Sequence, residues 1–159
     1  MGANQTKQQT IKINKIEYKF EKELGQGGFG RVVKVSRKSD NKEFALKIIP
    51  IKEQSKETIK SFQNEADILS KFNCNNIVKY YDSTKDNYNI YIIMEYCDGE
   101  TLRTFIDNHI NNNTLIEENK ISNIIKQICI GIKEIHDKKI IHRDLNMKIK
   151  IGDFGISNK

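Results

Sequence analysis

Residues 25–32 read Gly25-Gln26-Gly27-Gly28-Phe29-Gly30-Arg31-Val32, so their glycines have the spacing G-x-G-x-x-G. Glycines at such positions let backbone amides approach phosphate oxygens, because no side chains obstruct the approach. The same spacing occurs in dinucleotide-binding units, where it opens a helix. Here a β-branched run, Val32 to Val35, follows the loop. The sequence therefore predicts a phosphate-binding loop between two strands and not the start of a helix.

The residues around this loop have the patterns of five strands and one helix. Residues 16–24 alternate apolar and polar side chains, which is typical of a half-buried strand. The other four strands are expected over residues 32–35, 44–49, 77–81 and 88–94. Between the third and the fourth, residues 55–72 carry apolar side chains at helical spacing and predict an amphipathic helix.

Two charged residues in these elements share a face with apolar neighbours. Lys47 follows Ala45 by two positions, so both side chains lie on one face of the strand. Glu65 lies inside the apolar arc of the predicted helix, three residues after Phe62 and four before Leu69. A carboxylate that faces inward needs a partner.

After Gly99 the pattern becomes helical. Residues 101–110 predict one helix, and residues 119–138 predict a second, strongly amphipathic one. The second helix has an isoleucine stripe, formed by Ile121, Ile124, Ile125, Ile128, Ile132 and Ile135. An uncovered apolar stripe of that size predicts aggregation, a partner or an incomplete sequence.

Composition excludes several classes of protein. The chain has 159 residues, about the length of one domain, and 37% of them are hydrophobic. No apolar run reaches the roughly 18 residues of a membrane span. Three cysteines argue against a disulfide framework and for a reducing, cytoplasmic compartment. The 27 basic and 21 acidic residues are interspersed, so no nucleic-acid partner is expected.

The N-terminus fits the pattern of N-myristoylation, because Gly2 follows the initiator and Thr6 stands at the sixth position. The alternative is a short disordered tail that matches the pattern by chance. A single acyl chain would give only weak membrane association.

Four motifs in this order resemble the signature set of eukaryotic protein kinases: Gly25–Val32, Ala45-Leu46-Lys47, His142-Arg143-Asp144 and Asp153-Phe154-Gly155. The resemblance is to the serine/threonine type, and residues 94–102 are similar to two groups, the kinases of the initiation-factor alpha subunit and the NIMA-related kinases. It implies an α+β fold: a five-stranded antiparallel small lobe with one helix, and the beginning of a mainly helical large lobe.

The resemblance also implies boundaries within the chain. Residues 1–15 would be a flexible N-terminal tail, residues 16–94 the small lobe and residues 95–99 the hinge. Residues 100–159 would be an incomplete large lobe with two helices, the catalytic loop and the Asp-Phe-Gly motif.

ATP and Mg²⁺ are the implied cofactors, and a protein hydroxyl is the implied substrate. Asp144 would accept the proton of that hydroxyl or orient it. Asp153 would bind the magnesium ion, and Lys47, paired with Glu65, would position the α- and β-phosphates. The nucleotide would contact Leu24, Gly25, Gln26, Gly27, Gly28, Phe29, Gly30, Arg31, Val32, Ala45, Lys47, Met94, Glu95 and Cys97.

The catalytic loop departs from the family pattern. The family has a magnesium-binding asparagine five residues after the catalytic aspartate, but this chain has Ile149 there. Asp144 and Asp153 are only nine residues apart, about half the separation that the resemblance implies. The loop therefore looks shortened between Leu145 and Asn146. Two interpretations remain open. The chain is either a clipped, truncated and impaired serine/threonine kinase, or a pseudokinase-type module that binds nucleotide or acts as a scaffold without phosphotransfer.

Overall fold

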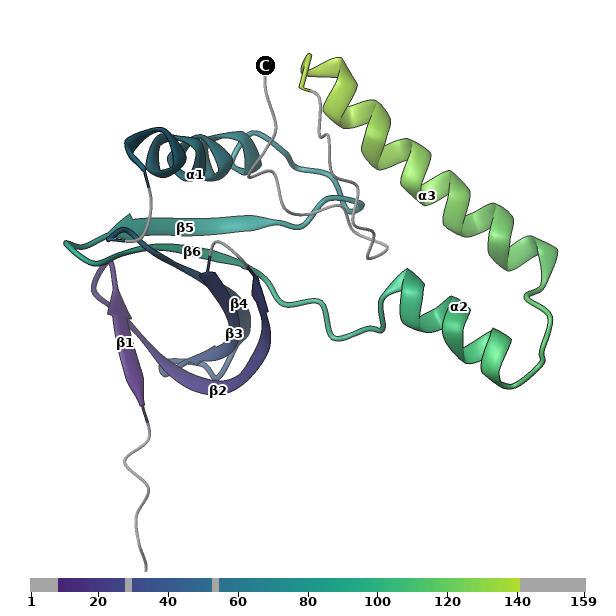
Figure 1. The fold of residues 1–159 in the computed structure, drawn as a ribbon, viewed down its shortest axis with the longest axis horizontal. Helices are drawn as coiled ribbons and strands as arrows, with labels where there is room; N and C mark the ends of the chain where they lie inside the picture. Colours follow the sequence, from purple (N-terminus) through teal and green to yellow (C-terminus); the bar gives the residue numbers. More distant parts are fainter. Residues whose placement is uncertain (1–8, 28–29, 53–54, 141–159) are drawn as a thin grey trace, which may run out of the picture. The chain divides into compact units, whose positions relative to one another are not determined.

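The computed structural model describes residues 9–27, 30–52 and 55–140, apart from the side chains at positions 58, 61, 63 and 65 (Figure 1). The elements are β1 (Thr10–Ile13), β2 (Ile16–Gly27), β3 (Gly30–Arg37), β4 (Glu43–Pro50), α1 (Lys56–Leu69), β5 (Tyr80–Lys85), β6 (Asn89–Glu95), α2 (Leu102–Asn111) and α3 (Glu118–Asp137). They form two compact units, one of which holds the strands and the other the three helices. Within the described part of the chain, every helix is too short or too polar to cross a membrane.

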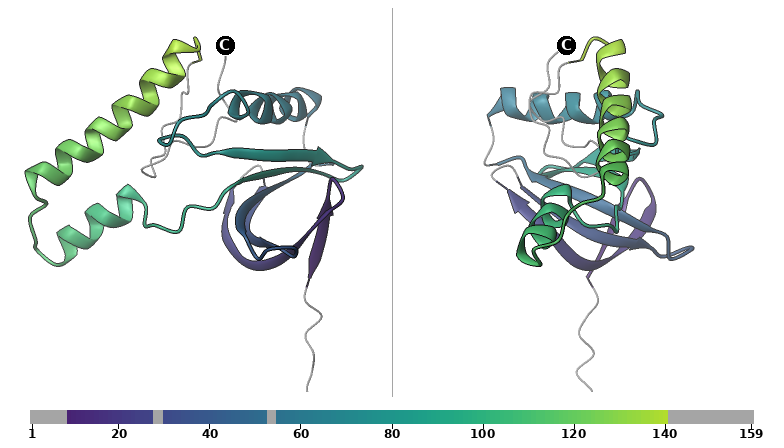
Figure 2. Two further views of the ribbon diagram at one scale, coloured as in Figure 1. Left: turned by 180° about the vertical axis from the view of Figure 1, so that it is seen from behind. Right: turned by 90° about the vertical axis from the view of Figure 1, so that its right-hand side faces the viewer.

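The strands form one sheet in the order β1-β2-β3-β4-β6-β5. It curls strongly, which is visible end-on in Figure 1 and from two further directions in Figure 2. Two register shifts in β2 leave Glu21 and Leu24 as extra residues opposite β3. Such bulges bend a strand and increase its local twist, and so they favour the curl.

The inner face of the curl holds the hydrophobic core of this unit. Its members come from five strands: Ile13, Tyr18, Val33, Val35, Phe44, Leu46, Ile48 and Ile93. The register explains why they meet, because Val33 lies opposite Leu46 and Val35 opposite Phe44. Burial of each large apolar side chain contributes about 1.5–3 kcal/mol.

The expectation of five strands was wrong, because the sheet has six. The additional strand, β1, comes from residues that the sequence assigns to a flexible tail. Asn14 and Lys15 have positive φ values of 45° and 71°, and they connect β1 to β2 as a two-residue hairpin turn. The fourth predicted strand, 77–81, is also displaced, because β5 covers Tyr80–Lys85.

The β1–β2 turn is tied to the other end of the sheet. The side-chain amide of Asn14 donates to both carboxylate oxygens of Asp82, at 3.0 and 2.9 Å, and lies 3.2 Å from the carbonyl oxygen of Ser83. Asp82 and Ser83 belong to β5, the last strand in the order, so this clasp joins the two edges of the curled sheet.

The helical unit has the three helices that the sequence predicts. Helix α1 buries Phe62, Ala66 and Leu69, whereas Asp67 is exposed. Thr101 caps the N-terminus of α2, because its hydroxyl accepts a hydrogen bond from the backbone amide of Thr104 at 3.0 Å. In α3 the isoleucine stripe changes along its length: Ile135 is buried, while Ile121 and Ile125 are 41% and 54% exposed.

Candidate functional site

The register of three central strands places four predicted site residues on one face of the sheet. Val32 lies opposite Lys47, and Ala45 lies opposite Met94. Directly opposite residues share a face, and alternate residues of one strand share it too. Val32, Ala45, Lys47 and Met94 therefore lie together on the outer face, the face opposite the inner core.

This outer face combines an apolar surface with the ammonium group of Lys47. Ala45 and Met94 are only 8% and 9% exposed, and Val32 and Lys47 are half-buried. Ile92 lies opposite Lys47 and is fully buried, so it extends the apolar surface. The sequence analysis did not single out Ile92, although its position two residues before Met94 is a signal for the same face.

The glycines of the loop have two different roles. A Cβ atom on Gly25 or Gly27 would meet no atom within 4 Å, so the space beside their backbone is open. Gly30 differs, because its φ is +144° and a Cβ atom there would lie 2.2 Å from the carbonyl oxygen of Ile48. Gly30 therefore lets β3 approach β4, whereas Gly25 and Gly27 leave room for a ligand.

The remaining loop residues are placed by β2 and β3. Leu24 is half-buried at the second bulge of β2, and Gly25 lies opposite Val32. Gln26 lies opposite Arg31. Arg31 alternates with Val32, so its side chain belongs to the inner face and is separated from the outer-face residues by the sheet. Gly28 and Phe29 lie outside the described residues.

The segment that follows β6 is held to the sheet by Lys34. This side chain lies on the outer face opposite Ala45, and its ammonium group stands 4.6 Å from the centre of the Tyr96 ring. It also forms an ion pair with Glu43 at 2.6 Å, and the hydrogen bond that the ammonium group donates to the Glu43 carboxylate raises the pKa of Lys34. Tyr96 stands between the predicted hinge residues Glu95 and Cys97, of which Cys97 is half-buried. Sequence reasoning missed Lys34, although its spacing from Val32 places it on the same face.

Apart from Lys47, the side chains predicted for catalysis and for metal binding lie outside the described part of the chain. Asp144, Ile149 and Asp153 lie outside the described residues, and so does the side chain of Glu65, whose backbone belongs to α1. The pairing of Lys47 with Glu65 stays a prediction. Among residues 9–27, 30–52 and 55–140, no group of three histidine, cysteine, aspartate or glutamate side chains could hold a metal ion.

Comparison with known proteins identifies the family of the chain. The model of the protein kinase domain family matches residues 18–159. Serine/threonine-protein kinase Nek5 of Homo sapiens is 34% identical over 151 residues, which cover 89% of this chain and 21% of the relative. Nek3 of Mus musculus is 37% identical over 141 residues, covering 83% of this chain and 27% of the relative. Nek8 of Danio rerio is 34% identical over 151 residues, which cover 89% of this chain and 21% of the relative.

The chain thus spans between a fifth and about a quarter of the length of these relatives. All three carry the Nek name of the NIMA-related kinases, one of the two groups to which the sequence is similar. The chain belongs to the protein kinase family, as a domain of the NIMA-related serine/threonine type.

Proposed function

We propose that this chain binds ATP on the outer face of its sheet and belongs to an enzyme that transfers a phosphoryl group to a protein hydroxyl. The observation that supports the proposal is the shared face of Val32, Ala45, Lys47 and Met94, with open space beside Gly25 and Gly27. An apolar surface suits a purine ring, and a nearby cation with accessible backbone amides suits phosphates.

Each predicted site residue has a role in this proposal. Val32, Ala45 and Met94 would contact the adenine, and the amides around Gly25 and Gly27 would approach the β- and γ-phosphates. The ammonium group of Lys47 would bind the α- and β-phosphates, with Glu65 fixing its position. Mg²⁺, when bound, neutralises charge on the phosphates. Asp153 would hold that ion, and Asp144 would orient the hydroxyl of the substrate.

A second candidate function is nucleotide binding without phosphotransfer. The observation that favours it is Ile149, because an aliphatic side chain cannot bind magnesium where the family has asparagine. The residues proposed for nucleotide binding are unaffected by this change. We therefore propose that phosphotransfer by this chain is severely impaired while ATP still binds.

The experiment measures both activities on the same protein. Binding of the fluorescent analogue N-methylanthraniloyl-ATP reports the site, and transfer of labelled phosphate to myelin basic protein reports catalysis. We expect saturable binding and little transfer. Lys47→Met should weaken binding about tenfold or more, because a charge-assisted contact to phosphate is lost.

Lys38→Met is the matched control, because Lys38 is exposed, lies beyond the end of β3 and pairs with Glu17 at 3.0 Å. It should bind like the unmodified chain. Equal weakening in both variants, or no binding at all, would refute the nucleotide site. Efficient transfer that Lys47→Met abolishes would instead establish an active kinase and refute the impairment.

Cytoplasmic localisation, with weak membrane association through an acyl chain on Gly2, is a separate proposal that rests on the sequence. If the chain is produced in eukaryotic cells, we expect an intact mass that includes loss of Met1 and addition of one myristoyl group. Gly2→Ala should remove that addition and release the protein into the soluble fraction. An unmodified mass for the original chain contradicts the acylation.

A further inference from the structure

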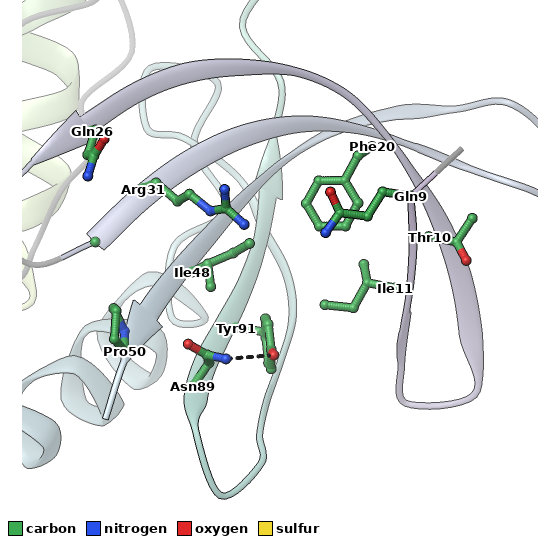
Figure 3. Close-up of a pocket in the computed structure, with 11 residues that line it drawn as sticks. Gln9, Thr10, Ile11, Phe20, Gln26, Arg31, Ile48, Pro50, Asn89 and Tyr91 are labelled. Carbon is green, nitrogen blue, oxygen red and sulfur yellow. Dashed lines mark hydrogen bonds between the residues drawn. The ribbon is translucent and has the colours of Figure 1, made fainter. Parts of the chain in front are cut away.

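The inner face of the sheet contains a cavity that the proposed function does not use. Its volume is about 440 Å³, within the range of small-molecule sites (Figure 3). Ile48 lies in its wall between two direct cross-strand neighbours, Arg31 on β3 and Tyr91 on β6. The pair Arg31 and Ile48 is next to the pair Val32 and Lys47 along the strands, so the two pairs point to opposite faces of the sheet. The cavity and the proposed ATP site therefore lie on opposite faces of the sheet.

One part of the cavity is apolar and continuous with the core. Ile11, Phe20 and Tyr91 are partly buried and pack against the inner core, to which Ile48 itself belongs. Figure 3 shows Ile11, Phe20, Ile48 and Tyr91 around the same space. Ile11 comes from β1, so the strand that the sequence assigns to a tail supplies one wall. A flat aromatic or branched body would bury its apolar surface here.

The lining of the cavity also includes one solvent-exposed arginine, Arg31. Within the described part of the chain, the side chain of Arg31 forms no ion pair or hydrogen bond, whereas that of Arg37 binds Asp40 and that of Arg103 binds Asp107. A guanidinium group offers two parallel N–H donors that match a carboxylate. Charge complementarity therefore indicates a carboxylate beside Arg31.

The acidic residue that contacts the cavity lining, Asp86, already accepts hydrogen bonds from other groups. Asp86 accepts hydrogen bonds from the backbone amides of Tyr88 and Asn89, each at 2.7 Å, and from the hydroxyl of Tyr91 at 3.0 Å. Asn89 in turn donates to the Tyr91 hydroxyl at 3.1 Å, as the dashed line in Figure 3 marks. The Asn89 side-chain oxygen accepts no hydrogen bond from the described residues, so it could accept one from an N–H group of a ligand.

We propose that this cavity binds a small aromatic carboxylate, with its ring between Ile11, Phe20 and Tyr91 and its carboxylate on Arg31. The site is independent of ATP binding, because the two ligands occupy opposite faces of the sheet.

The test uses the full chain and two probes of almost equal shape, indole-3-acetate and the uncharged indole-3-acetamide. Methyl NMR signals of Ile11 and Ile48 report occupation of the cavity. We expect indole-3-acetate to shift both signals saturably and the acetamide to bind at least tenfold more weakly. This comparison needs no variant. Equal affinities for the two probes, or unchanged methyl signals, would overturn the proposal.

Arg31→Gln tests the charge directly. It should weaken indole-3-acetate binding at least tenfold and leave the weak binding of the acetamide unchanged. Arg103→Gln, in the helical unit, is the matched control and should leave both affinities unchanged. Displacement of indole-3-acetate by a non-hydrolysable ATP analogue would also overturn the proposal, because the probe would then occupy the nucleotide site.

Discussion

Gly30→Ala is expected to lower the free energy of unfolding of the strand unit by about 3 kcal/mol. The φ value of +144° at Gly30 is strained for any residue with a Cβ atom. The new methyl group would also lie 2.2 Å from the carbonyl oxygen of Ile48, so β3 and β4 would have to separate. Urea unfolding monitored by circular dichroism measures the loss. We expect the slope of the unfolding free energy against urea concentration to stay unchanged.

Gly27→Ala is the matched control, because a Cβ atom at Gly27 meets nothing within 4 Å and its φ value is not positive. Its stability should change by no more than about 0.5 kcal/mol. Its expected effect is weaker nucleotide binding, since the methyl group would stand where the phosphates are proposed to approach. Similar stability losses in the two variants would contradict the different roles of these glycines.

Ile13→Ala is expected to cost about 3 kcal/mol, the typical loss when a buried isoleucine is truncated to alanine. Ile13 is only 1% exposed and belongs to the inner core, although it lies in a region that composition and pattern assign to a tail. The same urea experiment measures the loss. A change below about 0.5 kcal/mol would mean that β1 does not contribute to the core.

Ile16→Ala supplies the comparison, because it removes the same atoms from the residue directly opposite Ile13. Ile16 is 36% exposed, so its truncation should cost less than about 1 kcal/mol. A larger loss for Ile16 than for Ile13 would reverse the assignment of these two side chains to the core and to the surface.

The sequence predicts the outer face well, because the alternation of side chains along a strand needs no long-range information. Ala45 and Lys47 are placed on one face by a period of two, and the register adds Val32 and Met94. The same alternation separates Arg31 from Val32, although the glycine motif groups these two residues together. The alternation along the strand therefore predicts the face of each side chain better than the glycine motif does.

The sequence could not predict the two edges of the sheet. Strand β1 has only four residues, and its turn uses Asn14 and Lys15 instead of the Asn-Gly pair that usually marks such a hairpin. Strand β5 continues into the polar run Asp82–Lys85, which has no apolar alternation. Both strands depend on contacts between distant residues, such as Asn14 with Asp82, and these leave no local pattern.

The clasp between Asn14 and Asp82 has a consequence for any shortened form of this protein. The family match begins at residue 18, so a chain cut to that match would lose both β1 and the clasp. The backbone amides and carbonyls of β2 that now bond to β1 would then face solvent. Such an unpaired strand edge is a template for pairing with other molecules. We therefore expect a chain cut to the family match to self-associate more readily, because the edge of the 12-residue β2 would replace the edge of the four-residue β1.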